Sequence, residues 1–211
     1  SGIRFLDLRS VIILTKGSAG QSYGAFCNNG MVLRHKGTCN DGVGKSACGG
    51  EIIINNPSDT KTKILRNVLV GNFALFGATG GRLFVEGEAG DRFAVRNSGA
   101  TAVVEGVGEY CAEYMTNGTI LNLGTFSRGF GNGMSGGFAY QYDPKKIIKK
   151  NISKESVLFN YLDGKTEISN IHEETIFTLL NWHFNATKSR IAKYIIDNWS
   201  TEKFNMVYIT P

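Results

Sequence analysis

The chain has 211 residues, of which 42% are hydrophobic and 19% charged, and this composition is typical of a globular protein rather than a disordered one. Its formal net charge of +5 is only mildly basic, and no stretch approaches the roughly 18 apolar residues of a membrane-spanning helix. We therefore expect no contact with a membrane, and a cytoplasmic or organellar location. The 27 glycines beside only three prolines exclude collagen and indicate a chain that turns often at fixed positions.

The glycines of the first two thirds of the chain recur with a period of 19 residues. Six of them define the repeat: Gly30, Gly49, Gly80, Gly99, Gly118 and Gly137. The wider step between Gly49 and Gly80 contains a polar stretch, which we interpret as an insertion at about residues 55–68. Short β-prone runs follow these glycines, at residues 31–33, 51–54, 83–85, 102–104, 119–123 and 138–142.

This pattern predicts a mainly β fold, namely a single-stranded right-handed β-helix with coils of about 19 residues. One coil cannot bury its apolar face alone, so about six stacked coils between Gly20 and Asp143 would share one core. Glycine permits the positive φ angles and the close backbone approach that such corners need. We therefore assign the six repeat glycines a structural role.

A second part, residues 145–211, contains only one glycine and has apolar residues at helical spacing. We predict helices at 156–162, 167–184 and 189–199, with Thr187 as a helix cap, and a strand-like stretch at 204–209. The predicted organisation is thus a β-helix over residues 1–144 and a helical cap over 145–211 that packs on the open end or the side of the solenoid.

Two glycine-rich stretches resemble nucleotide-binding motifs. Residues 131–136 match G-x-G-x-x-G, but a strand follows them instead of the helix that a dinucleotide site needs. Residues 42–46 resemble the end of a phosphate-binding loop, but Cys39 replaces its first glycine. We interpret both as solenoid corners and predict no cofactor bound by this chain.

Other reactive side chains form no recognised site. The spacing of the cysteines fits neither a zinc nor an iron–sulfur site, so we interpret them as small buried hydrophobes: Cys27, Cys39, Cys48 and Cys111. The histidines are scattered, at His35, His172 and His183. A few carboxylates recur at solenoid spacing and could bind a cation or act as an acid–base pair, but we favour surface pairing with Arg82, Arg92 and Arg96: Glu86, Glu88, Glu105, Glu109 and Glu113. We predict no catalytic and no metal-binding residue.

The basic run at residues 145–150 contains no aromatic residue among its lysines. Nucleic-acid binding normally adds such rings to a basic patch, so we interpret this run as a solvated linker and expect no nucleic-acid partner.

Several long stretches resemble the C-terminal GXGXG domain of the glutamate synthase large chain. They lie at residues 77–81, 90–108, 113–116 and 133–137, and residues 20–26 and 40–45 are similar to earlier coils of that domain. The tail resembles the family's closing helices through five residues: His183, Thr187, Ser189, Ala192 and Trp199. The chain departs from the family at residues 109–112, usually Asp-His-Gly-Cys, and at 128–132, usually Arg-Asn-Phe-Ala-Ala.

The resemblance implies a domain of a larger enzyme that makes glutamate from glutamine and 2-oxoglutarate. The family's large chain also has a glutaminase domain, a central domain and a synthase domain that holds FMN and a 3Fe-4S cluster. Its β-helix carries no catalytic residue and holds those domains at the separation that an internal ammonia passage requires. The expected partners are therefore these other domains, with a small NAD(P)H-oxidising subunit as a further candidate, and we expect the chain to be one piece of such a protein.

Two other classes of β-helix remain as alternatives. One is a stand-alone carbohydrate-active enzyme, which would need a carboxylate pair in an open groove. The other is a protein similar to the formylmethanofuran dehydrogenase subunit that shares the coil motif. The predicted helical tail favours glutamate synthase.

Overall fold

A computed structural model describes residues 7–57 and 67–211 of the chain, and most of the predicted insertion at 55–68 lies outside them. The strands are β1 (Val11–Ser18), β2 (Met31–Thr38), β3 (Cys48–Asn55), β4 (Val68–Val70), β5 (Gly80–Val85), β6 (Glu88–Ala89), β7 (Ser98–Gly106), β8 (Asn117–Thr125), β9 (Phe138–Tyr142), β10 (Leu158–Tyr161) and β11 (Met206–Thr210). The helices are α1 (Ile148–Asn151), α2 (Glu167–Thr187), α3 (Arg190–Asp197) and α4 (Trp199–Glu202), followed by a 3₁₀ turn at Lys203–Asn205.

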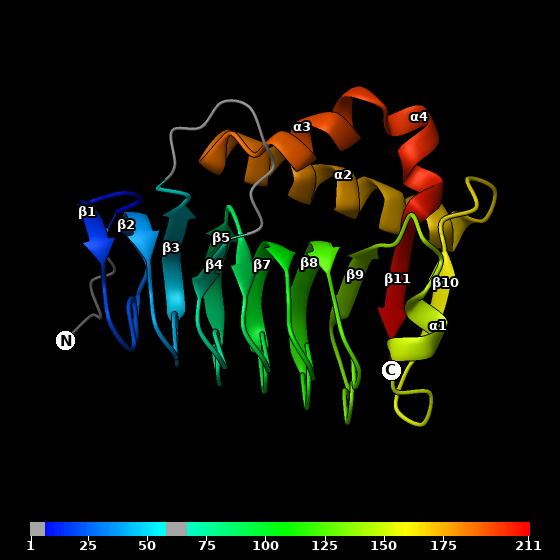
Figure 1. Cartoon of the computed structure of the whole chain (residues 1–211), viewed down its shortest axis with the longest axis horizontal. Coiled ribbons are helices and arrows are strands. Elements are labelled where there is room, and N and C mark those ends of the chain that lie inside the picture. Colours follow the sequence, from blue (N-terminus) through cyan, green and yellow to red (C-terminus); the bar gives the residue numbers. More distant parts are fainter. Residues whose placement is uncertain (1–6, 58–66) are drawn as a thin grey trace.

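The main sheet is the side of a β-solenoid of about six turns. Its strands lie in the order β1-β2-β3-β5-β7-β8-β9-β11-β10, and the first seven are parallel. Figure 1 shows these strands as one row, each contributed by the next coil. The predicted fold class and all six β-prone runs are confirmed, because each run lies inside a strand of this row.

The 19-residue period appears directly in the strand register. Val32 lies opposite Glu51 and Arg82 opposite Thr101, which are pairs 19 positions apart. The step from β3 to β5 is 31 residues at Glu51, as the insertion requires, but it becomes 32 where Cys48 lies opposite Gly80. Bulges absorb such differences, and one of them shortens the step from β7 to β8 to 18 residues at Ala102.

Alternation along each strand divides the apolar residues between two layers. In β5, Leu83 and Val85 point into the solenoid, where they join its continuous core, whereas Phe84 points outward. Outward apolar residues such as Phe84 and Val103 form a second layer with residues of α2 and α3. The helices therefore cover one outer face of the sheet, as Figure 1 shows.

Six tight turns, each preceding one strand of the main sheet, form a row that we call the turn edge. They lie at residues 22–26, 42–46, 73–77, 92–96, 110–114 and 129–133. In each turn the first, third and fifth residues have positive φ. Glycine occupies all three positions in the last turn, but Arg92, Ala94 and Arg96 occupy them in the fourth. For a non-glycine residue the left-handed conformation costs about 1–2 kcal/mol of conformational free energy, so contacts between the stacked coils must compensate for this cost.

Hydrogen bonds in both directions provide that compensation. The amide of the middle residue donates to the preceding coil, as from Ala94 to the Ala74 carbonyl at 2.9 Å. The amide of the first residue donates to the next coil, as from Arg92 to the Glu109 carbonyl at 2.7 Å. Both nucleotide-like motifs of the sequence, 42–46 and 131–136, overlap turns of this edge.

The repeat glycines are required for two different reasons, a positive φ angle or the close approach of a neighbouring coil. Gly118 and Gly137 have φ angles of +96° and +82°, which side chains adopt only with strain. At Gly80 and Gly99 the neighbouring coil is too close for a side chain, because a Cβ would overlap the carbonyl groups of Cys48 and Thr79.

The C-terminal segment closes the last coil. β11 pairs antiparallel with β9 on one side and with β10 on the other, which ends the parallel row. The strand predicted at 204–209 is thus confirmed, but the helix predicted at 156–162 is wrong, since Leu158–Tyr161 is a strand. Pairing with β11 overrides the local helical pattern there.

The two longer predicted helices are present as α2 and as α3 followed by α4. The prediction of Thr187 as a helix cap is wrong, because Thr187 is the last residue of α2 and donates its hydroxyl proton to the His183 carbonyl at 2.7 Å. Ser189 is the cap, and its hydroxyl oxygen accepts the amide proton of Ala192 at 3.1 Å.

The first coil is open, in contrast to the last. Within the described residues β1 pairs only with β2, and all its residues are exposed. Its apolar side chains extend both layers of the sheet, because Ile12 lies opposite Val32 and Ile13 opposite Leu33. Ile12 is 58% and Leu14 71% exposed, so this end presents an uncovered apolar surface.

Candidate functional site

The five recurring carboxylates fall into two groups. Glu109 and Glu113 lie at the turn edge and form ion pairs with Arg128 at 3.0 Å and with Arg92 at 3.4 Å. The predicted pairing of Arg82 and Arg96 with carboxylates is not what the structure shows: their guanidinium groups lie 4.1 Å and 6.0 Å from the centres of the Trp182 and Tyr114 rings.

The other three carboxylates lie near strand boundaries, because Glu86 directly follows β5, Glu88 begins β6 and Glu105 is near the end of β7. Glu86 accepts hydrogen bonds from the Asn55 side chain and the Asn56 amide at 3.0 Å and 3.1 Å. Glu88 accepts one from the Thr125 hydroxyl at 3.1 Å. Glu105 contacts His183 of α2, so each of the three is held by a different element.

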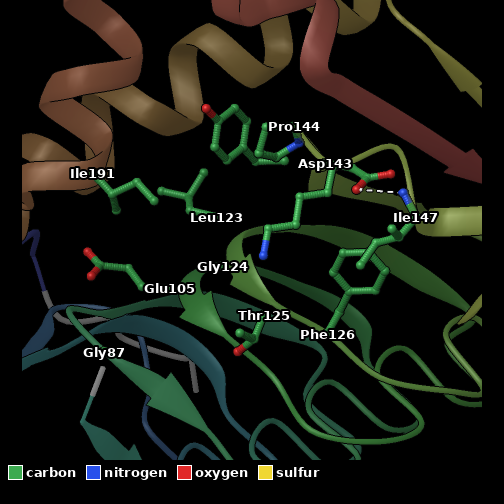
Figure 2. A pocket seen from close by; sticks show the side chains of 12 residues that line it. Gly87, Glu105, Leu123, Gly124, Thr125, Phe126, Asp143, Pro144, Ile147 and Ile191 are labelled. Carbon is green, nitrogen blue, oxygen red and sulfur yellow. Dashed lines mark hydrogen bonds between the residues drawn. The ribbon is translucent and has the colours of Figure 1, made fainter. Parts of the chain in front are cut away.

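A pocket of about 430 Å³, which we call the corner pocket, opens beside Glu105. It lies at the carboxyl ends of β7, β8 and β9, and α3 and the start of α1 complete it. Its apolar lining consists of Leu123, Phe126, Tyr142, Pro144, Ile147 and Ile191. In Figure 2, Glu105 and Ile191 lie on one side of the pocket and Phe126 and Ile147 on the other.

One wall of the corner pocket is fixed by a hydrogen bond between the solenoid and α2. His183 Nε2 lies 3.0 Å from Glu105 Oε1 and donates the hydrogen bond, while Nδ1 is buried without a partner in the described part of the chain. The imidazole is fully buried and the Glu105 side chain is 14% exposed. The second carboxylate oxygen of Glu105 accepts no hydrogen bond from a described residue.

The opposite wall is fixed by Asp143. Its carboxylate accepts hydrogen bonds from the amides of Ile147 and Ile148 at 3.0 Å and 2.8 Å, and from the Tyr161 hydroxyl at 2.6 Å. Burial, followed by this hydrogen bond, raises the pKa of Tyr161. Asp143 is therefore a structural anchor that orients the chain after β9.

The lysine run is not a simple solvated linker. Lys146 donates to the Phe204 carbonyl at 2.6 Å and lies 3.9 Å from the centre of the Tyr161 ring. Burial of its ammonium group lowers the pKa of Lys146. Lys145 is exposed and lines the corner pocket, and its ammonium group makes no hydrogen bond or ion pair with residues 7–57 or 67–211.

The cysteines have the character of core residues, with one exception. Cys27, Cys39 and Cys111 are buried, but Cys48 is exposed, which corrects its interpretation as a buried hydrophobe. Burial raises the pKa of Cys39 to about 12 and shifts that of Cys111 in the same direction, which disfavours the reactive thiolate. Across the described residues, no group of three or more His, Cys, Asp or Glu side chains is arranged to hold a metal ion.

The sequence could not have shown the corner pocket. It joins residues from β7, β8, β9, α3 and the turn before α1, and only Glu105 among them was a candidate residue. Among residues 7–57 and 67–211 we find no helix that could span a lipid bilayer.

Comparison with known proteins identifies the chain's relatives. The GXGXG motif family matches residues 4–211. The ferredoxin-dependent glutamate synthase of Antithamnion sp. is 47% identical over 92% of the chain. The glutamate synthase [NADPH] large chain of Bacillus subtilis and the glutamate synthase [NADH] of Schizosaccharomyces pombe are each 41% identical, over 92% and 98% of the chain.

These relatives are much longer proteins, and the chain spans 10–13% of their lengths. Their shared region is the solenoid with its C-terminal helices, in agreement with the coil motifs and the phased glycines. The chain therefore belongs to the GXGXG family, in the form that glutamate synthase large chains contain.

Proposed function

We propose that the chain is a non-catalytic structural domain of a glutamate synthase large chain. It holds the glutaminase and FMN synthase domains of that chain in register while glutamine and 2-oxoglutarate are converted to glutamate with a reductant. FMN and the 3Fe-4S cluster belong to the synthase domain, and a small NAD(P)H-oxidising subunit is a further partner of the assembly. The observation that carries the proposal is the contrast between the open first coil and the closed last coil.

Stiffness is the first property that a spacer needs. Each coil is bonded to its neighbours through the main sheet and again through the turn edge. A row of side chains adds a third connection: Asp41, Asn72 and Asp91 accept the amide protons of Asn72, Asp91 and Glu109 at 2.7–2.9 Å. A stack bonded along several lines resists bending between coils.

An attachment surface is the second property. The exposed apolar side chains of β1 and its outer edge, which pairs with no other described strand, form such a surface, since edge strands and apolar patches favour pairing with further protein. The occupant that fits the comparisons is another part of the same large chain. We also propose that residues 1–144 and 145–211 act as two parts, the solenoid and the cap that closes its far end.

The attachment is tested with Ile12→Asp in the intact large chain, with Ile171→Asp on α2 as the matched control because both side chains are 58% exposed. A charge on β1 should lower glutamine-dependent glutamate synthesis strongly and leave the glutaminase reaction in place. The control should retain both activities. Equal activities of the two variants would contradict the proposal.

The absence of catalysis is tested separately on the purified 211-residue chain. We expect no glutaminase activity, no flavin absorbance and no bound iron. A yellow or brown preparation, or measurable glutamine hydrolysis, would show that this domain has a catalytic part.

A further inference from the structure

The corner pocket has the size and lining of a small-molecule site. Its volume of about 430 Å³ lies in the range of about 300–1,000 Å³ typical of ligand pockets. Leu123, Phe126 and Ile191 supply apolar walls from three separate segments. The proposed scaffold role makes no use of this pocket, so a ligand could bind there whether or not the domain acts as a scaffold.

Two opposite charges face the pocket with unused bonding capacity. Glu105 has one oxygen bonded to His183 and a second oxygen with no described donor, and Lys145 has an ammonium group with no described partner. A ligand that filled the pocket would remove water from the Glu105 carboxylate and would lie beside the exposed Lys145. Because a buried charge without a partner is costly, the favoured ligand offers an opposite charge to each.

We propose that the corner pocket binds a free α-amino acid with an apolar side chain of about the size of leucine. Its ammonium group pairs with Glu105, its carboxylate pairs with Lys145, and its side chain packs against Leu123, Phe126 and Ile191. The flexible side chain of Lys145 adjusts to the carboxylate, whereas Glu105 is held in place by His183. Both charges of the ligand contribute, so neither an amine nor an acid alone satisfies the site.

This charge requirement defines the probes. L-leucine, isopentylamine, which lacks the carboxylate, and 4-methylpentanoate, which lacks the ammonium group, are titrated into the 211-residue chain by calorimetry. We expect L-leucine to bind at least tenfold more tightly than either of the other two, a difference of about 1.4 kcal/mol. Equal affinities for the three probes, or no heat with L-leucine at millimolar concentrations, would overturn the proposal.

Variants locate the binding site and assign the two charges. Lys145→Gln should weaken L-leucine about tenfold and leave isopentylamine unchanged. Glu105→Gln, which keeps a side-chain oxygen for His183, should weaken L-leucine and leave 4-methylpentanoate unchanged. Lys149→Gln changes an exposed lysine outside the pocket and is the matched control.

A pocket-filling variant gives an independent test of location. Ile191→Trp should abolish binding of all three probes, and unchanged circular dichroism shows that the variant is folded. L-leucine binding that survives Ile191→Trp, or that falls equally in Lys145→Gln and Lys149→Gln, would place the ligand elsewhere and refute the proposal.

Discussion

The two ends of the solenoid are made of the same kind of coil but differ in what covers them. At the C-terminal end, β11 pairs with β9 of the last coil, β10 pairs with β11, and Val207 and Ile209 are completely buried. At the N-terminal end, β1 carries Ile12, Ile13 and Leu14 with their side chains exposed. Figure 1 shows the two ends at opposite extremes of the molecule's longest axis.

The repeat alone therefore does not close the end of a solenoid. Every coil offers strand edges and apolar side chains, and a covering segment decides whether they are buried. Among the described residues such a segment covers only the C-terminal end, and under the proposed function the N-terminal end is the one that meets further protein.

The largest effect on stability should come from truncating an isoleucine to alanine at the closed end, and the same change at the open end should cost much less. Ile209→Ala removes a fully buried side chain and should lower the free energy of unfolding by about 2–5 kcal/mol. Ile13→Ala removes a side chain that is 40% exposed and should lower it by less than about 1 kcal/mol in the 211-residue chain. Urea unfolding of both variants measures the difference, and equal losses would mean that the first coil is as well packed as the last.

A smaller effect on stability is expected at the turn edge, where substitution of a glycine and substitution of a non-glycine residue should have different consequences. Gly44→Ala adds a side chain at φ +65°, with its Cβ 2.9 Å from Leu75 Cδ2, and should cost about 1–2 kcal/mol of stability. Ser46→Gly, at φ +54° in the same turn, removes the same kind of strain and should not destabilise the protein. Thermal unfolding distinguishes them, and a similar loss in both would contradict the strain assigned to this edge.

Acid should weaken the closed end. The His172 ring stacks on Tyr208 at 4.3 Å and hydrogen-bonds the Tyr140 hydroxyl at 2.9 Å, and burial lowers its pKa. The unfolded chain therefore binds a proton more readily, so this contribution to stability is complete above pH about 6.5 and is lost as pH falls through the folded-state pKa.

Urea midpoints measured between pH about 7 and about 5 test this prediction. They should fall with acidification in the parent chain and fall less in His172→Gln. An identical pH dependence of the two proteins would show that His172 does not cause the acid sensitivity.

The smallest effect should come from the surface of α3. Lys193 and Asp197 form an exposed ion pair at 2.8 Å, one helical turn apart. Lys193→Ala should change stability by only about 0.3–0.5 kcal/mol, and less in high salt. A loss of the size expected for Ile209→Ala would show that α3 depends on surface charge rather than on its apolar face.

Much of the solenoid could be predicted from the sequence because the glycines mark the repeat. The register between β2 and β3 follows the spacing of Gly30 and Gly49, and the outward layer follows from strand alternation. β1 was not predicted because it precedes the first phased glycine. The left-handed backbone conformation of Arg92 and Ala94 was not predictable either, since only hydrogen bonds between coils make that conformation favourable.

The C-terminal part and the corner pocket depended on contacts between distant segments. Leu158–Tyr161 has a helical pattern locally and becomes a strand because β11 lies beside it. The Glu105–His183 hydrogen bond joins residues 78 positions apart, and their separation in the sequence does not indicate this contact.

Hydrogen exchange of the β1 amides distinguishes an open first coil from one that another part of the large chain covers. Amides on the outer edge of β1 should exchange rapidly in the 211-residue chain and become protected in the intact large chain, whereas amides of β9 and β11 should exchange slowly in both. The same rapid exchange of β1 in the intact large chain would contradict the claim, because the open coil would then have no partner there.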